Sequence, residues 1–166
     1  MQVLDYSREP PQPMDPAAWH STLRDYYTYF CSIAPQDLLP GRQHFDPFAI
    51  PVALPRLILL DVQRVPLRYR YRLVGTKEAE LYGHDPTGRW YDEVRPRTPQ
   101  TELGYTRLQH AAERGTLSYR KGPVLAIRHR EHQSAENLVC PFASDGRTVD
   151  MITVCGVIFR RDGTEV

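Results

Sequence analysis

The segment from Leu67 to Val74 constrains the fold of this chain more than any other. Apolar or aromatic side chains alternate there with arginines, in the order Leu67, Arg68, Tyr69, Arg70, Tyr71, Arg72 and Leu73. Successive side chains of a strand point to opposite faces, so this pattern predicts a strand with one apolar face. Gly75 follows at once, and residues 77–82 predict a short helix with Thr76 as its cap and Gly83 as its end. This order of elements indicates an α+β fold.

Length and composition suit one soluble domain with an ordinary core. The chain has 166 residues, of which 41% are hydrophobic and 10% aromatic. The 21 basic and 20 acidic residues leave a formal net charge of +1, which argues against nucleic acid and against an anionic membrane as partners. Apolar runs are too short to span a bilayer, and the N-terminus lacks the apolar region of a secretory signal. We therefore expect a cytoplasmic protein.

The cysteines indicate buried thiols. Their number is odd and no CxxC pair occurs among Cys31, Cys140 and Cys155. A disulfide framework or a zinc knuckle is therefore not expected, and a reduced compartment is the natural setting.

Proline usage divides the chain into four parts. Residues 1–14 contain Pro10, Pro11 and Pro13 and predict a flexible arm. Residues 15–35 predict an amphipathic helix that starts at Asp15-Pro16 and ends at Pro35. A proline-rich connector follows over residues 36–55, and residues 56–162 form the core domain. The predicted helix carries one apolar seam at a mean spacing of 3.5 residues, made of Trp19, Leu23, Tyr26, Phe30 and Ile33.

The core domain should contain five strands and one longer helix. The helix is expected from about Pro99 to Arg114, with Gly115 as its stop. Asp145-Gly146 is the strongest hairpin signal and joins the last two strands. The five expected strands span about residues 56–63, 67–74, 117–128, 137–142 and 149–160.

The last strand is apolar on both faces. One face carries Val149, Met151, Thr153, Cys155, Val157 and Phe159. The other carries Ile152, Val154, Gly156 and Ile158. A sheet with one wet face would show polar residues there, so both faces must be covered. We expect the apolar seam of the N-terminal helix to cover the second face, at Val154 and Ile158. That helix can belong to the same chain or to a partner.

Several spaced motifs resemble those of one protein family. They are Leu59-Leu60-Asp61-Val62, Tyr69 to Thr76, Tyr82-Gly83, Thr87-Gly88-Arg89 and Asp145 to Ile152. Over roughly residues 15–160 the chain resembles the stand-alone PAS proteins of alphaproteobacteria, formerly a family of unknown function. The resemblance implies a five-stranded antiparallel sheet with short helices on one face. It also implies a helix before the first strand that often serves dimer contacts, and a general role in signal transduction. It implies no catalytic residues.

A ligand pocket is expected between the inner sheet face and the helices. Aromatic walls with a few hydroxyls suit a small organic ligand of unknown identity, although the same rings can simply fill a core. The expected wall comprises Tyr71, Leu73, Tyr82, Trp90, Tyr105, Leu108, Tyr119 and Met151.

Cofactor and metal chemistry find little support in the sequence. No cysteine lies in the motif of a flavin photosensor, and His110 is the only reasonable axial ligand for haem. The group His129-Arg130-Glu131-His132 has unfavourable spacing for zinc and predicts a solvated loop. We expect no metal site and identify no cofactor.

Two further patterns have ordinary explanations. The arginines between Leu67 and Leu73, with Arg64, are expected to form salt bridges or a protein contact rather than to bind nucleic acid. His84-Asp85 is a pair in sequence only, and no GxSxG, phosphate-loop or HExxH motif occurs.

The sequence therefore favours a non-enzymatic sensory or interaction module that works as a homodimer or through a signalling protein. A small enzyme on a cone-shaped α+β frame, with a buried Asp/His pair, is one alternative. A ligand-free interaction domain with a filled core is another.

Overall fold

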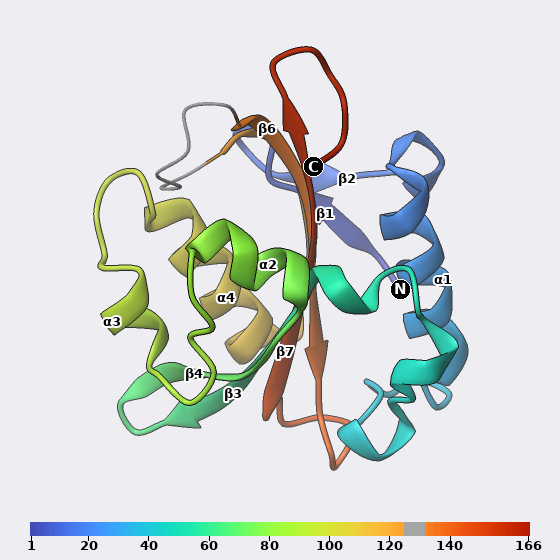
Figure 1. Cartoon of the computed structure of the whole chain (residues 1–166). Helices are drawn as coiled ribbons and strands as arrows, with labels where there is room; N and C mark the ends of the chain where they lie inside the picture. The colour runs from blue at the N-terminus through green and yellow to red at the C-terminus, as the bar shows by residue number, and fades with distance from the viewer. Residues whose placement is uncertain (125–131) are drawn as a thin grey trace.

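One twisted sheet separates two layers of helices in the computed structural model, which describes residues 1–124 and 132–166 (Figure 1). The strands lie in the order β2-β1-β5-β6-β7-β3-β4. Helices α2, α3 and α4 cover one face, and α1 with the segment after it covers the other (Figure 1). The strands are β1 (Val3–Asp5), β2 (Gln12–Pro13), β3 (Leu57–Arg64), β4 (Leu67–Val74), β5 (Leu117–Pro123), β6 (His132–Phe142) and β7 (Met151–Arg160).

The ends of the helices follow the sequence signals more closely than their starts, because α1 begins at Ser21 rather than at Asp15-Pro16 and α4 at Glu102 rather than near Pro99. The connector adds three short 3-10 turns, Arg42–His44, Pro47–Ala49 and Leu54–Arg56, and Pro16–Ala18 precedes α1. Gly83 and Gly115 end α2 and α4 in the left-handed region, with φ of 72° and 64°. The four α-helices are α1 (Ser21–Ile33), α2 (Thr76–Tyr82), α3 (Tyr91–Val94) and α4 (Glu102–Arg114).

The expected five-stranded antiparallel sheet is present, but two further strands extend it. Strands β3 to β7 pair antiparallel throughout. Strand β1 adds to β5 in parallel, and β2 then pairs with β1, so the sheet has seven strands and is mixed.

The expected flexible arm of residues 1–14 instead contains β1 and β2. Val3 is buried, and the Tyr6 amide donates to the Tyr119 carbonyl at 2.8 Å. The backbone of β5 would otherwise present unpaired groups at the sheet edge, and three residues suffice to pair with it. Proline content alone therefore misjudged this segment.

A β-bulge changes the face of the sheet on which the last side chains of β4 lie. Leu60 lies opposite Tyr71, whereas Leu59 lies opposite Leu73, so Arg72 is an extra residue. The alternation is inverted beyond this point. Val74 is consequently buried, whereas Leu73 is 40% exposed on the opposite face.

Helix α1 packs on the sheet of its own chain. Leu23, Tyr26 and Phe30 are fully buried, and Trp19 stacks on Tyr119 with ring centroids 5.0 Å apart. Ile33 packs at the margin of the same cluster. The apolar seam predicted from spacing thus covers the sheet within one chain.

The face that α1 covers is the opposite one from that expected. Its cluster contains Met151, Cys155 and Val157 from β7. Val154 packs in the cluster beneath the other helices, and Ile158 lines a cavity on that side. The alternation of β7 divides its residues correctly into two sets. Because both sets are apolar, the alternation does not identify which helix covers which set. The helix-docking role expected for Val154 and Ile158 is therefore wrong.

Helix Thr76–Tyr82 begins one residue earlier than expected. Its N-cap is Gly75, and Thr76 makes no capping hydrogen bond. In the described ranges, no helix is long and apolar enough to cross a membrane.

Replacing Phe30 by alanine should destabilise the protein by about 3 to 5 kcal/mol, because it removes a fully buried ring that packs edge-on against Phe142. Urea denaturation would measure the change. Asp25→Ala, at an exposed position of α1, should stay within about 0.5 kcal/mol of the parent protein. Equal stability of the two variants would show that α1 is not part of the core.

Candidate functional site

A cavity of about 130 Å³ lies between the sheet and helices α2, α3 and α4. These helices cover the face of the sheet opposite α1 (Figure 1). Its lining combines aliphatic side chains with three arginines, one glutamate, two tyrosines and one asparagine.

The sheet supplies the floor of the cavity in parallel rows. Strand pairing aligns Arg120 of β5 with Asn137 of β6, and Asn137 with Gly156 of β7. This row is polar. The next row aligns Val139 with Val154, which continues to Ile58 on β3 and is apolar. The floor thus changes from polar to apolar over a single step along the strands.

The helices supply the roof. Helix α4 places Gly104, Arg107 and Leu108 over the cavity, because these positions fall on one helical face. A Cβ at Gly104 would contact only Tyr91 Oη among the described atoms, at 3.5 Å. The missing side chain at Gly104 is therefore one reason why space remains here.

Arg107 is a buried cation held by neutral groups. It is 4% exposed. Its Nε donates to Ser118 Oγ at 3.0 Å, and Nη2 donates to the carbonyls of Ser118 at 2.8 Å and Asn137 at 3.3 Å. Nη1 donates to Asn137 Oδ1. Burial, and then the nearby charge of Arg120, lowers the pKa of Arg107 to about 9.

Arg120 is the second buried cation of the polar row. It is 8% exposed, and Nη2 donates to the Pro123 carbonyl at 3.0 Å. Burial lowers the pKa of its guanidinium. No salt bridge among residues 1–124 and 132–166 involves Arg107 or Arg120. The cavity therefore has excess positive charge at this end.

Glu78 of α2 is the one acidic residue of the described lining. Its Oε1 lies 3.2 Å from where a Cβ on Gly156 would be, so the glycine makes room for the carboxylate. Burial raises the pKa of Glu78 to about 7, against the opposing effect of Arg95 and Arg56. This group therefore changes charge near neutral pH.

Four tyrosines form a connected cluster beside the cavity. Tyr71 stacks on Tyr91 with centroids 5.7 Å apart, and the hydroxyls of Tyr71 and Tyr82 are 3.3 Å apart. Tyr105 packs edge-on against Tyr91. Burial raises the pKa of Tyr91 to about 12, so this hydroxyl stays protonated at neutral pH.

The structure brings together only part of the expected pocket wall. Tyr82 and Leu108 line the cavity. Tyr71 and Tyr105 lie behind the lining, packed on Tyr91.

The other four expected wall residues lie elsewhere. Trp90 is at the surface under Arg68, whose Cζ is 4.2 Å from the ring centroid. Leu73 faces away because of the bulge in β4. Tyr119 and Met151 belong to the cluster under α1. These four assignments to a pocket wall are wrong.

The polar lining was not predicted from the sequence. Arg107 and Asn137 are 30 residues apart in the chain, and only the crossing of α4 over β5 and β6 brings them into contact. The sequence analysis did not single out Glu78 or Arg95. The one sequence signal for Glu78 is that it shares a face of a short helix with Leu81 and Tyr82.

The residues considered for cofactors lie outside the cavity lining. His110 Nδ1 is 2.5 Å from the Tyr6 hydroxyl, which ties α4 to the N-terminal segment. Cys140 and Cys155 are buried free thiols, and Cys31 is half-buried. The group His129 to His132 falls largely outside the described residues. Within them, no cluster of three or more His, Cys, Asp or Glu could hold a metal ion.

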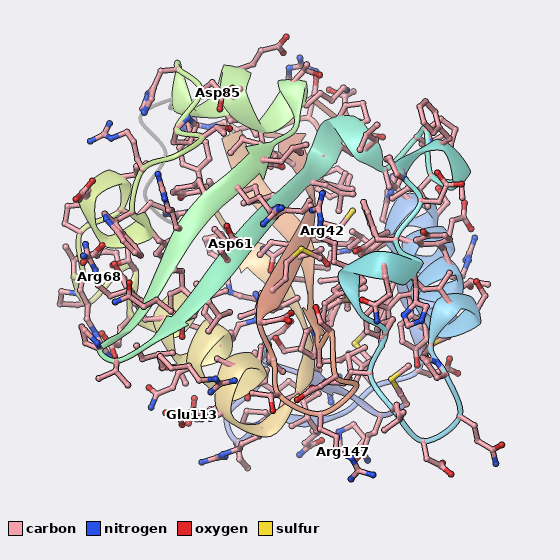
Figure 2. The ribbon with its side chains drawn as sticks, turned by 90° about the horizontal axis from the view of Figure 1, so that it is seen from below. Arg42, Asp61, Arg68, Asp85, Glu113 and Arg147 are labelled. Atoms are coloured by element: carbon pink, nitrogen blue, oxygen red, sulfur yellow. The ribbon has the colours of Figure 1, made fainter. Side chains whose placement is uncertain are left out.

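The arginine stripe of β4 is engaged in local contacts. Arg68 pairs with Asp92 at 2.9 Å and Arg72 with Asp61 at 2.9 Å. Arg70 Nε donates to the Gly88 carbonyl at 2.8 Å. Figure 2 shows Asp61 on β3 and Arg68 on the neighbouring strand β4, well away from α1. The expected salt bridges are confirmed for Arg68 and Arg72.

Comparison with known proteins agrees with this arrangement. A family model described as a PAS domain matches residues 18–158. The chain belongs to the PAS domain family. No curated protein and no solved structure gives a significant match. The matched range covers α1, strands β3 to β6 and β7 as far as Ile158, so the cavity described above lies within the PAS domain.

The unusual carboxylate of Glu78 should make the stability of this PAS domain depend on pH. Its pKa is raised to about 7 in the folded state, from about 4.5. The folded state therefore binds more protons, and stability is lost as pH rises from about 4.5 through 7. Glu78→Gln should flatten this slope in denaturation curves and be the more stable protein at pH 8. Parallel curves for both proteins would contradict the assignment, and Glu80→Gln, at an exposed position of α2, is the control.

Proposed function

We propose that this PAS domain is a sensory module that binds a small molecule in the cavity and transmits its bound state through helix α1. The observation that carries the proposal is an enclosed hollow with an apolar wall and a few converging polar groups. Such a combination is the usual form of a small-molecule site. The family supports a sensory or interaction role in general.

The volume restricts the ligand. An engineered cavity of about 150 Å³ accommodates benzene, whereas drug-sized ligands occupy roughly 300 Å³ or more. The cavity of about 130 Å³ therefore suits a molecule of about six to seven non-hydrogen atoms. Haem and flavin are far larger.

The sheet offers a direct route from the cavity to α1. Val154 lines the cavity, and its neighbour Thr153 faces the other layer. There the hydroxyls of Tyr26 and Thr153 are 2.6 Å apart in a buried contact. A ligand that shifts β7 thereby changes the packing of α1, and a partner that distinguishes the two arrangements responds to the ligand.

The partner is proposed to be a second copy of the chain or a signalling protein that contacts the α1 layer. The apolar seam of α1 is used within the chain, which leaves its outer side for such contacts. The adjacent connector exposes Phe48 at 89% and Val52 at 69%. The hydroxyl of Tyr29 accepts from the Asp46 amide at 2.6 Å and joins this connector to α1.

Of the two alternatives, neither has a specific observation in its favour. An enzyme on a cone-shaped frame would place an Asp/His pair in the pocket, and the described lining contains neither residue type. A ligand-free interaction domain would have a filled core at this position.

Native mass spectrometry of gently purified protein should show an added mass that disappears on denaturation. Gly104→Leu should abolish this mass, because the new side chain fills the cavity without a backbone clash. Gln109→Leu adds the same side chain to an exposed position of α4 and should retain the mass. A folded parent protein that never carries or acquires a small molecule would refute the sensory proposal and favour the ligand-free domain.

A further inference from the structure

We propose that the ligand of this cavity is a small organic carboxylate with an apolar body, and that Arg107 and Arg120 bind its carboxylate group. The proposal rests on the sensory function above and specifies the chemical class of the ligand. Three observations lead to it. Two buried guanidinium groups have no salt bridge among residues 1–124 and 132–166, the floor changes from polar to apolar, and the cavity is small.

The two arginines lie near each other on the lining of the cavity. Arg120 lies opposite Asn137 in the pairing of β5 with β6, and Arg107 reaches the same asparagine from α4 through its backbone and side-chain oxygens. Both arginines line the cavity. They come from different layers, Arg107 from α4 and Arg120 from β5, so each layer contributes one cation to the lining.

The hydrogen bonds of Arg107 leave one donor for a ligand. A guanidinium has five N–H groups. Arg107 makes four hydrogen bonds, all to neutral oxygens of Ser118 and Asn137. One N–H on Nη1 therefore has no acceptor among the described residues, and Arg120 makes a single hydrogen bond there. A carboxylate can accept from both groups at once.

The local charge favours an anion. Two buried cations side by side repel each other, and neutral acceptors compensate only part of the lost hydration. Glu78 is the one acidic residue of the described lining, and its pKa of about 7 leaves it partly neutral at physiological pH. A bound carboxylate would provide the missing negative charge.

The remaining wall defines the rest of the ligand. Beyond the polar row the cavity is lined by aliphatic side chains from the sheet and from α4, namely Ile58, Leu60, Leu108, Val139 and Val154. A free phosphate or sulfate would leave these side chains without contacts. An aliphatic acid of about six to seven non-hydrogen atoms would contact both the polar row and these aliphatic side chains.

Binding of acid and amide pairs tests the charge requirement. The probes are 3-methylbutanoate with 3-methylbutanamide, and butanoate with butanamide, because each pair has the same shape. Titration calorimetry at pH 7 should detect the acids and find the amides at least tenfold weaker. Inorganic phosphate should bind more weakly than either acid.

Variants test the residues. Arg120→Met keeps the length of the side chain and should weaken acid binding about tenfold to a hundredfold, the range for a lost charged hydrogen bond. Arg120→Lys should retain part of the affinity. Arg147→Met, at an exposed position labelled in Figure 2, should change nothing. Near-ultraviolet circular dichroism verifies that each variant is folded. If Arg120→Met does not fold, Arg107→Met replaces it.

The outcomes separate this proposal from the sensory function. If the amides bind as tightly as the acids, or if a neutral molecule copurifies, the carboxylate proposal is overturned while ligand sensing stands. Preference for phosphate overturns it as well. Absence of any binding together with no copurified mass overturns both proposals.

Discussion

Strand β7 determines the organisation of this molecule, because apolar side chains cover both of its faces. Met151, Cys155 and Val157 pack under α1, and Ile152 with Val154 pack under the helices on the other side. Neither helical layer could be removed without exposing a continuous apolar surface. The central position of β7, between β6 and β3, also makes it the strand through which the two layers are joined.

The second governing feature is the burial of Arg107, which is energetically unfavourable. A guanidinium without an acidic partner is expensive to bury, and replacing such groups by apolar side chains is often neutral or stabilising. Arg107 is nevertheless buried with all its described hydrogen bonds to neutral oxygens, next to Arg120 and an open volume of about 130 Å³. The proposed ligand site would use all three of these features.

The sequence predicts the helices and strands well, but it predicts less well on which face of the sheet a side chain lies. Alternation and glycine stops located β4, α2 and the end of α4 almost to the residue. Leu73 was misassigned because a bulge inverts the alternation, and a bulge leaves no clear mark in composition. Tyr119 and Met151 were misassigned because both faces of the sheet are apolar. The polar lining could not be predicted, since contacts such as Arg107 to Asn137 depend on how α4 crosses the sheet.

The ends of the sheet restrict how this domain can assemble with other proteins. One edge is β2, a two-residue strand that ends in Pro13 and so lacks a donor. The other edge, β4, is partly covered by the following turn, since the Tyr71 amide donates to the Arg89 carbonyl at 2.9 Å and Gly88 donates back at 2.7 Å. Neither edge presents a free ladder of backbone groups to a second chain. Continuous intermolecular sheets through β2 or β4 are thereby disfavoured.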